Sequence, residues 1–330
     1  MSNEVDIREN DILRYDPQLL SVLLIDRSKP KDDGTYGHII WGTDNYETRG
    51  EGYQEYDEIN AEAITGKHGS VVRPRVNKSK AEQEHRSRDK AEVFTAAWIC
   101  NKQNNLVDNA WFEREGVFNT ETDENWVTNP DKVMFPDTKG KTWQDYVSDT
   151  RLEMSCGEAP YLVSRYNVIT GEEINVKDRI GLLDRKLRVV CENTDNEKDW
   201  FKWATVAYQN TYGFEWQGDN LLIAREAMIF TLFDYYQLKF GKQPTKAQTM
   251  KIAEIVSWNL WQMDGLKGVV PGSCSEKVTK EYNLFGEETV SVEKCKGCEK
   301  DDITKHNGIY CMIRDWSAKK TIRFIDLIKG

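Results

Sequence analysis

The sequence predicts an α/β fold, with a strand–glycine–helix junction at residues 150–162 as its centre. Leu152 to Ser155 can end a short buried strand, Gly157 allows a tight turn, and Pro160 suits the first turn of a helix. Further along the chain, segments with helical periodicity alternate with short apolar segments that have strand character. This alternation is typical of a parallel sheet with helices packed on it.

The junction also indicates a binding site for a polar ligand. The first N–H groups of a helix have no partner within the helix and lie at its positive end, which favours a nucleotide or another polar cofactor. The dinucleotide pattern G-x-G-x-x-G is absent here. The junction alone therefore does not identify the ligand.

Composition narrows the class of protein. The 330 residues suffice for one large or two ordinary domains, and 11 Trp with 39% hydrophobic residues indicate an aromatic-rich folded chain. No apolar run reaches membrane-spanning length and the N-terminus is acidic, so we expect neither a membrane helix nor a secretory signal. Seven cysteines, an odd number, then indicate reduced thiols and a cytoplasmic location.

The first 90 residues are expected to form an N-terminal α+β region. An apolar run at 11–26 precedes a turn at 29–34 and a strand at 38–41. The net charge of −10 gives no general attraction to nucleic acid, so any DNA contact needs a local basic patch.

Residues 67–90 form such a patch, with eight Lys or Arg against three acids. One interpretation is a solvated helix face, and the other is a segment that follows DNA phosphates. In the second interpretation the DNA-binding candidates are Arg73, Arg75, Lys78, Lys80, Arg86 and Arg88.

Two carboxylates follow predicted strands downstream of the junction. Helices are expected at 178–191 and 195–210, and the strand at 211–216 then contains Glu215. A long amphipathic helix follows, and a T-x-x-Q capping box begins the next one before a strand that leads to Asp264. An acid at the C-terminal edge of a strand is placed to accept hydrogen bonds from ribose hydroxyls.

These segments resemble the amino (N6-adenine) DNA methyltransferases. Phe94-Thr95 is similar to their "FTP" motif, with Ala96 in place of the proline. Residues 152–162 resemble their first cofactor motif, L-[DE]-P-x-C-G-x-G-x-F-L, with Met154 for the proline and Ala159 for the second glycine. The segments around Glu215 and Asp264 resemble the second and third motifs, although Glu215 lies 58 residues after Gly157 rather than about 20.

The resemblance implies a fold, a cofactor and an activity. It implies a class I methyltransferase (Rossmann-like) sandwich over residues 91–270, in which Glu215 holds the ribose and Asp264 the adenine amine of S-adenosylmethionine. The complete implied cofactor set is Phe94, Thr95, Glu153, Cys156, Gly157, Glu215 and Asp264. The chain looks close to modification subunits of bacterial restriction systems, which implies DNA and a restriction or specificity subunit as partners.

Cysteines gather in the last 60 residues, in a region expected to form a zinc-binding β-hairpin (271–330). Cys274, the C-x-x-C pair Cys295 and Cys298, and Cys311 are the predicted ligands of a closed, structural zinc site. His306 is the one imidazole in the region that could replace a thiolate. The alternative interpretation is four unrelated buried cysteines, and no thioredoxin-like unit surrounds the pair to favour a redox role.

One expected motif is missing. The family delivers its target base with a [DNS]-P-P-[YFW] tetrapeptide, and this chain contains no Pro-Pro. Asp315 and Trp316 are the substitutes in the right chain position, as acceptor and stacking ring, although the same stretch is also typical of a hairpin turn. The predicted function is S-adenosylmethionine-dependent DNA adenine methylation, and the alternative is a non-catalytic nucleic-acid-binding or assembly subunit on a degenerate methyltransferase fold.

Overall fold

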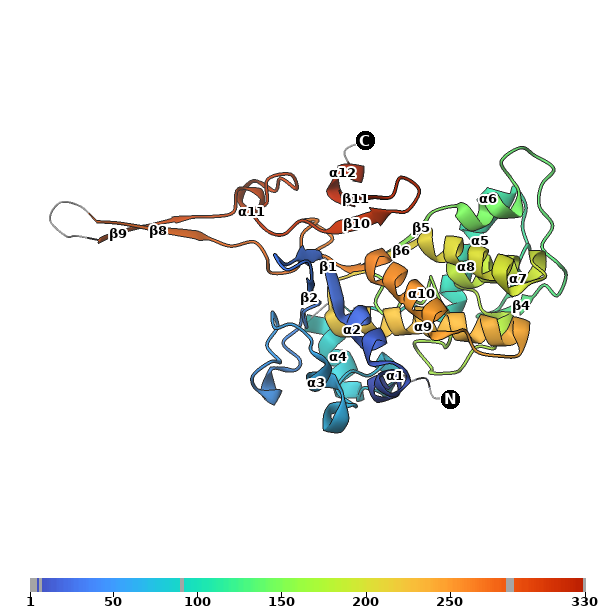
Figure 1. The fold of residues 1–330 in the computed structure, drawn as a ribbon, viewed down its shortest axis with the longest axis horizontal. Coiled ribbons are helices and arrows are strands. Elements are labelled where there is room, and N and C mark those ends of the chain that lie inside the picture. The colour runs from blue at the N-terminus through green and yellow to red at the C-terminus, as the bar shows by residue number, and fades with distance from the viewer. Residues whose placement is uncertain (1–4, 6–7, 90–91, 283–287, 329–330) are drawn as a thin grey trace.

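The computed structural model describes residues 5, 8–89, 92–282 and 288–328. Lys90 and Ala91, which belong to the predicted basic segment and the predicted FTP-like stretch, lie outside the described residues. The chain forms a rounded body of helices and short strands, from which one long hairpin projects (Figure 1). The α/β class predicted from the sequence is confirmed.

A parallel three-stranded sheet lies inside the body. Its strands are β5 (Arg151–Met154), β6 (Thr211–Glu215) and β7 (Leu260–Gln262), in the order β5-β6-β7. Glu153 pairs with Gly213, and Glu215 pairs with Gln262. Three parallel strands correspond to one βαβαβ half of a doubly wound sheet, which contains two such halves. The parallel sheet agrees with the predicted α/β class, and the methyltransferase sandwich stays a prediction.

Each crossover between the parallel strands contains two helices. The helices are α7 (Leu182–Asn193), α8 (Glu197–Gln209), α9 (Gly218–Phe240) and α10 (Lys246–Asn259). The predicted capping box begins α10, where the Thr245 side chain accepts from Gln248 N–H. Helix α9 differs from the expected amphipathic helix, because 17 of its 23 residues are buried. A helix that is buried all round is a central element of the core.

The N-terminal region packs onto the same core. One cluster of buried apolar side chains runs from Ile12 to Leu260. Arg225 of α9 donates to the carbonyls of Leu23 (2.6 Å) and Leu260 (2.6 Å), which links the N-terminal region to β7. The elements of this region are α1 (Glu9–Tyr15), α2 (Pro17–Leu24), β1 (Ile25–Pro30), β2 (Tyr36–His38), α3 (Ala61–Ile64) and α4 (Lys80–Asp89).

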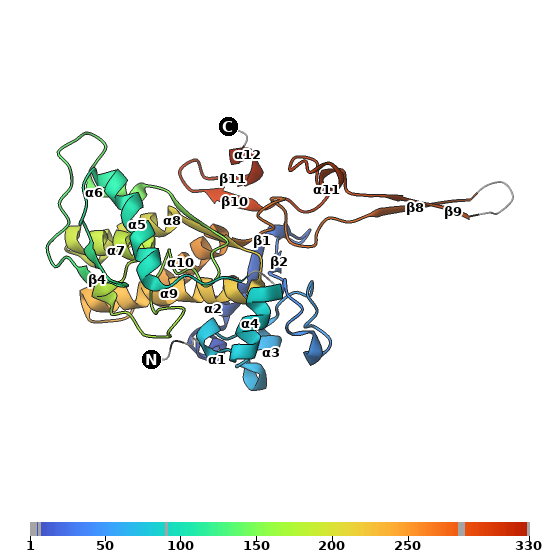
Figure 2. The same ribbon diagram turned by 180° about the vertical axis from the view of Figure 1, so that it is seen from behind.

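Four more elements separate this region from the sheet. They are α5 (Ala97–Phe112), β3 (Asn119–Thr122), β4 (Asn125–Thr128) and α6 (Trp143–Ser148). Helices α2 and α10 lie on the near side of the body in Figure 1, and α4 and α5 lie on the opposite side, in front in Figure 2. The strands β6 and β7 themselves contact α9 and α10.

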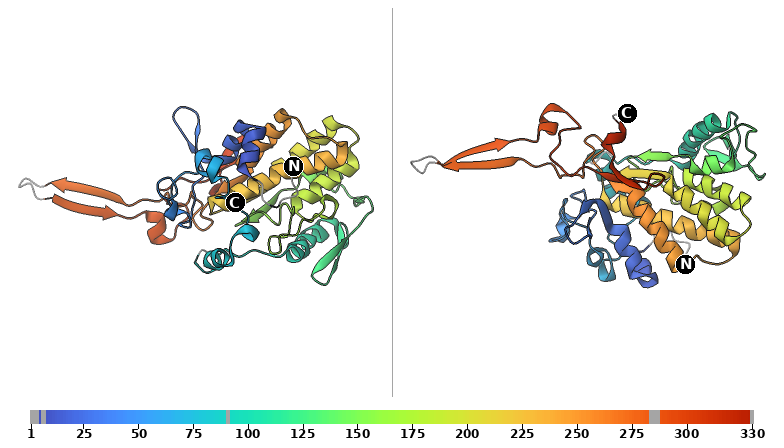
Figure 3. Two further views of the ribbon diagram at one scale, coloured as in Figure 1. Left: turned by 90° about the horizontal axis from the view of Figure 1, so that it is seen from below. Right: turned by 45° about the horizontal axis from the view of Figure 1, so that its top comes forward.

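The C-terminal region consists of two antiparallel hairpins. Strands β8 (Lys277–Tyr282) and β9 (Glu288–Glu293) form the projecting arm, which Figure 3 shows from two further directions. After α11 (Lys296–Lys300), β10 (Met312–Asp315) and β11 (Lys320–Arg323) form the second hairpin, and α12 (Ile325–Ile328) follows. In the part of the chain that the structure describes, no helix is both long and apolar enough to cross a membrane.

Candidate functional site

A cavity of about 720 Å³ opens at the C-terminal ends of β5 and β6. Segments that are far apart in the sequence meet there, since Gly157 N–H donates to Glu215 Oε2 at 2.8 Å. Six of the seven residues in the predicted cofactor set line this cavity: Phe94, Thr95, Glu153, Cys156, Gly157 and Glu215. The chain between the two motifs contains α7 and α8, and its length does not prevent the motifs from meeting.

The turn after β5 differs from the prediction, because no helix begins at Pro160. Ser155 (φ 50°), Gly157 (φ 53°) and Ala159 (φ 61°) all have left-handed backbone conformations. A left-handed residue interrupts an α-helix, and the next α-helix begins only at Leu182. The predicted positive helix end is therefore absent from the cavity.

Two carboxylates of the protein itself accept hydrogen bonds from the N–H groups of this turn. Glu153 accepts hydrogen bonds from the N–H groups of Tyr161 (3.4 Å) and Leu162 (3.2 Å). Glu215 accepts from Gln217 N–H at 3.2 Å as well as from Gly157. Burial raises the pKa of both carboxyls, more strongly for Glu153, and the N–H groups lower it in part. Each carboxylate has about four lone-pair positions, so neither is saturated by these bonds.

The cavity wall is acidic and aromatic. Glu55, Asp89 and Glu92 join Glu153 and Glu215 in the lining, against the single lining cation Arg88. Asp89 pairs with Arg88, and Glu92 pairs with Arg86 behind the wall, which neutralises these two acids. The rings in the lining are those of Phe94, Tyr161 and Trp216. An excess of acids disfavours phosphate-containing ligands and favours ligands that carry positive charge.

Asp264 is the predicted cofactor residue that does not line the cavity. Its side chain accepts from the N–H groups of Leu266 (3.0 Å) and Lys267 (3.2 Å), and it forms an ion pair with the Lys267 ammonium (3.2 Å). The D-x-L pattern thus stabilises a turn after β7, because a short acidic side chain readily binds the N–H groups that follow it. The predicted contact with an adenine amine does not fit this position, and Leu266 reaches the cavity instead.

A buried ion-pair network next to the cavity was not predicted from the sequence. Asp219, in the first turn of α9, binds the Arg86 guanidinium (2.8 Å) and the Lys78 ammonium (3.2 Å). Arg86 also binds Glu92 (2.6 Å), and Tyr46 donates to Asp219 (2.7 Å). Asp219 lies in a strongly apolar segment, which indicates that its carboxylate is buried. Because a buried carboxylate requires a cation as partner, this position could have pointed to the ion pairs.

This network corrects the prediction for the basic segment. Lys78 and Arg86 are 6% and 1% exposed, so they cannot follow DNA phosphates. Arg73 forms an ion pair with Glu82 (3.0 Å), and the Arg75 guanidinium lies over the Phe94 ring, 5.2 Å from its centre. Lys80 and Arg88 remain as exposed cations on α4. Neither interpretation describes the whole segment, because the solvated helix face applies to the exposed side of α4 and not to the buried Lys78 and Arg86.

A second site lies at the base of the projecting arm. Cys274 precedes β8, Cys295 and Cys298 flank the start of α11, and His306 lies in the following loop. Their ligand atoms all lie within 4.8 Å of one another, so the group could hold a metal ion. Burial works against a thiolate here, but backbone hydrogen bonds, first among them that from Asn307 N–H (3.3 Å), lower the pKa of Cys295 to about 6.

Cys311 does not belong to this group, which corrects the predicted ligand set. Its thiol is buried among apolar side chains that include Phe214 and Trp261, and it donates to the Gln262 carbonyl at 3.2 Å. His306 takes the fourth position, as the only histidine near the three other cysteines. The spacing in the sequence could not show which of the two is the fourth ligand, because Cys311 follows His306 by only five residues.

Asp315 and Trp316 lie away from the cofactor cavity. Asp315 ends β10, and its carboxylate accepts from Ser317 Oγ (2.8 Å) and Ala318 N–H (2.9 Å) within the hairpin turn. Trp316 Nε1 donates to Asn259 Oδ1 at 2.7 Å. Both residues line a different cavity, so the predicted acceptor and stacking ring do not meet the predicted cofactor site. The hairpin interpretation describes this stretch.

No family model, curated protein or solved structure matches this chain.

Proposed function

We propose that this chain binds S-adenosylmethionine in the cavity at the ends of β5 and β6, as a subunit of a DNA-modification system. The observation that carries the proposal is the convergence of three separate segments, around Phe94, Gly157 and Glu215, on one cavity. Its volume of about 720 Å³ lies within the range of about 300–1,000 Å³ that is usual for small-molecule sites.

The chemistry of the wall fits this cofactor better than a nucleotide with phosphates. S-adenosylmethionine carries a sulfonium, an ammonium and a carboxylate, so its net charge is positive, and the lining contains five acids and one Arg. Glu215 retains lone pairs for ribose hydroxyls beside its bonds to Gly157 and Gln217. The rings of Phe94, Tyr161 and Trp216 offer faces for an adenine.

Between the two functions that the sequence leaves open, the geometry favours the non-catalytic subunit. Methyl transfer to a base needs an acceptor and a ring beside the cofactor. Asp315 and Trp316, the predicted pair, line the other cavity and are engaged in hydrogen bonds of their own. A DNA adenine methyltransferase activity would therefore have to use other residues. Transfer of a labelled methyl group to DNA by the wild-type protein would demonstrate methyltransferase activity and contradict the non-catalytic function.

Glu215→Ala is expected to weaken S-adenosylmethionine binding by about 1.5–3 kcal/mol, which is roughly 10- to 150-fold in Kd. The reason is the loss of a carboxylate that accepts hydrogen bonds. Calorimetric titration measures the change, with Asp264→Asn as the control, because Asp264 lies outside the cavity lining. Absence of S-adenosylmethionine binding by the wild-type protein would refute the proposal. An effect of Asp264→Asn as large as that of Glu215→Ala would refute the placement of the cofactor in this cavity.

We also propose that the metal at the base of the arm is zinc in a structural role. With Zn–S of about 2.3 Å and Zn–N of about 2.0–2.1 Å, tetrahedral coordination places sulfur and nitrogen about 3.6 Å apart. His306 Nδ1 lies 3.6 Å from each of the three sulfurs, those of Cys274, Cys295 and Cys298. Three thiolates and one imidazole fill all four positions, which is the pattern of a structural zinc site.

A further inference from the structure

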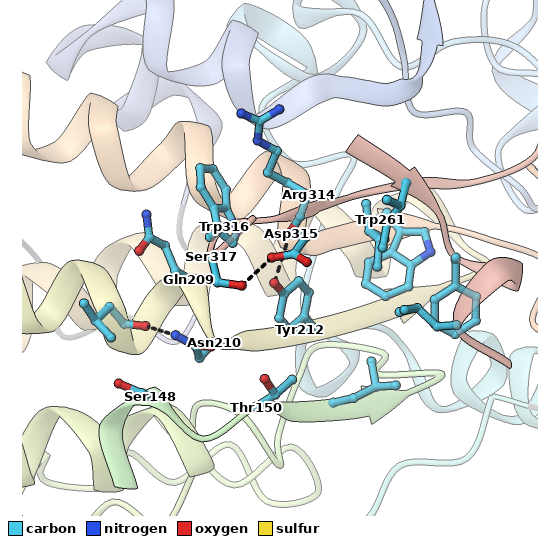
Figure 4. A pocket seen from close by; sticks show the side chains of 16 residues that line it. Ser148, Thr150, Gln209, Asn210, Tyr212, Trp261, Arg314, Asp315, Trp316 and Ser317 are labelled. Atoms are coloured by element: carbon cyan, nitrogen blue, oxygen red, sulfur yellow. Dashed lines mark hydrogen bonds between the residues drawn. The ribbon is translucent and has the colours of Figure 1, made fainter. Parts of the chain in front are cut away.

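A second cavity, of about 640 Å³, lies against the face of the parallel sheet (Figure 4). Its lining comes from β5, the end of α8, β6, β7 and the β10–β11 hairpin with α12, and it shares no residue with the cofactor cavity. The proposed function gives this cavity no role. The chemistry of its walls indicates which ligands fit.

The cavity exists because the hairpin covers the sheet incompletely. Ile313 and Phe324 pack over Phe214 of β6 and Trp261 of β7. Strand β5 lies beyond this cover, so Leu152 is 41% exposed. Parallel sheets are normally covered on both faces, so an open stretch of sheet at the edge of a cavity is available to a ligand.

The walls differ in chemistry from one end of the cavity to the other. Figure 4 shows Trp261 at one end, and Gln209, Asn210 and Ser317 at the other. The apolar part of the lining also contains Leu152 and Phe324. The only charged residues in the lining are Arg314 and Asp315, which balance each other, and Asp315 is engaged in the hairpin turn. This near-neutral wall contrasts with the acidic wall of the cofactor cavity.

The rings are held in place while one amide remains available. Tyr212 donates its hydroxyl to the Arg314 carbonyl (3.1 Å), and Trp316 donates to Asn259. The side-chain amide of Gln209 has no hydrogen-bond partner among the residues that the structure describes. The side chain of Asn210 donates its NH₂ group to the Val206 carbonyl (2.9 Å), which leaves the side-chain oxygen Oδ1 as an acceptor. Fixed rings beside amide groups suit a flat ring with a hydrogen-bonding edge.

We propose that this cavity binds an uncharged planar heterocycle of the purine-base class, at a site separate from the cofactor cavity. An acyl chain would leave the amides and hydroxyls at one end without partners, which is costly in a partly buried site. A phosphate group or a metal ion would meet no surplus charge of the required sign, because Arg314 and Asp315 cancel. A base stacks on the rings and exchanges hydrogen bonds with the amide end.

The test uses free adenine as the probe, with ligand-observed NMR and calorimetry on the full chain. Leu152→Trp fills the cavity from the exposed strand, and Leu266→Trp is the matched control, because Leu266 is also exposed but lines the cofactor cavity. Adenine binding should persist in excess S-adenosylmethionine, be lost in Leu152→Trp and be retained in Leu266→Trp. Gln209→Ala should weaken it about tenfold through the lost amide bonds.

Two results would overturn the proposal. The first is adenine binding that is absent, or that S-adenosylmethionine removes and Leu152→Trp does not change. The second is equal binding of indole, a flat ring without the base edge, together with no effect of Gln209→Ala on adenine. Failure of the cofactor proposal alone gives a different result. The wild-type protein would then not bind S-adenosylmethionine but would still bind adenine, and Leu152→Trp would abolish the adenine binding.

Discussion

Cys295→Ser is expected to remove the zinc that we propose for this group and to unfold the base of the projecting arm. Cys295 supplies one of three thiolates. The group joins Cys274, which precedes β8, to residues that follow β9. Structural zinc sites contribute an apparent free energy of about 10–16 kcal/mol in zinc-finger peptides, so loss of one thiolate outweighs any other single contact there. Elemental analysis should fall from about one zinc per chain to nearly none, and hydrogen exchange should rise across the described parts of 274–306.

Cys311→Ala is the matched control for this prediction. It removes a cysteine from the same region, but one that packs in the apolar cluster beneath the second hairpin. The variant should keep its zinc and lose only about 1–3 kcal/mol of folding stability from the smaller core side chain. Loss of zinc in Cys311→Ala with retention in His306→Ala would contradict the ligand set and restore the four-cysteine site.

The arm explains why a metal bound at its base would matter to the fold. An isolated two-stranded hairpin is marginally stable in water. No other described element packs along β8 and β9 (Figures 1 and 3), and the described Val278, Val290 and Val292 are each more than half exposed. Because the described part of the arm shows no hydrophobic core, we expect the group at its base to be the main restraint on how its strands leave the body.

The sequence was most informative where a local pattern has one structural solution. The strands before Gly157, at Glu215 and before Asp264 pair in parallel, and the capping box begins α10, because apolar runs and caps act over a few residues. Site residues were less predictable, because the same residue types serve two purposes. Asp264 has the sequence context of a ligand-binding acid, yet its carboxylate binds turn N–H groups. Pro160 has the context of a helix start, yet the left-handed Ala159 before it interrupts the helix.

Burial was the property that the sequence concealed most. The basic segment has the composition of a DNA-binding surface, but Lys78 and Arg86 are directed inward by Asp219, 141 and 133 residues away. Charge counts along the chain treat every cation as exposed. Only the tertiary structure shows which of them are neutralised by a buried acid.

Asp219→Asn is expected to destabilise the folded chain by about 3–5 kcal/mol, the cost of breaking a buried ion pair from one side. The variant leaves the buried Arg86 and Lys78 with Glu92 as the remaining acid of the network. Chemical denaturation measures the change. Arg88→Ala is the control, because Arg88 lies on the same helix as Arg86 (α4) but its side chain is 75% exposed and forms its ion pair with the neighbouring Asp89. It should change stability by no more than about 0.5 kcal/mol.

The pH dependence of this effect has a definite sign. Although burial alone raises the pKa of Asp219, Arg86 and Lys78 outweigh it and hold that pKa well below its ordinary value of 3.8. A carboxyl with a depressed folded-state pKa contributes stability above its unfolded pKa and loses it as the pH falls through the folded value. Glu153 and Glu215 act in the opposite direction, because burial raises their pKa and protonation relieves the cost. The stability difference between wild type and Asp219→Asn should therefore be full at pH 7 and shrink below about pH 4. A difference that stays constant down to pH 2 would show that Asp219 is not the charged centre of the network.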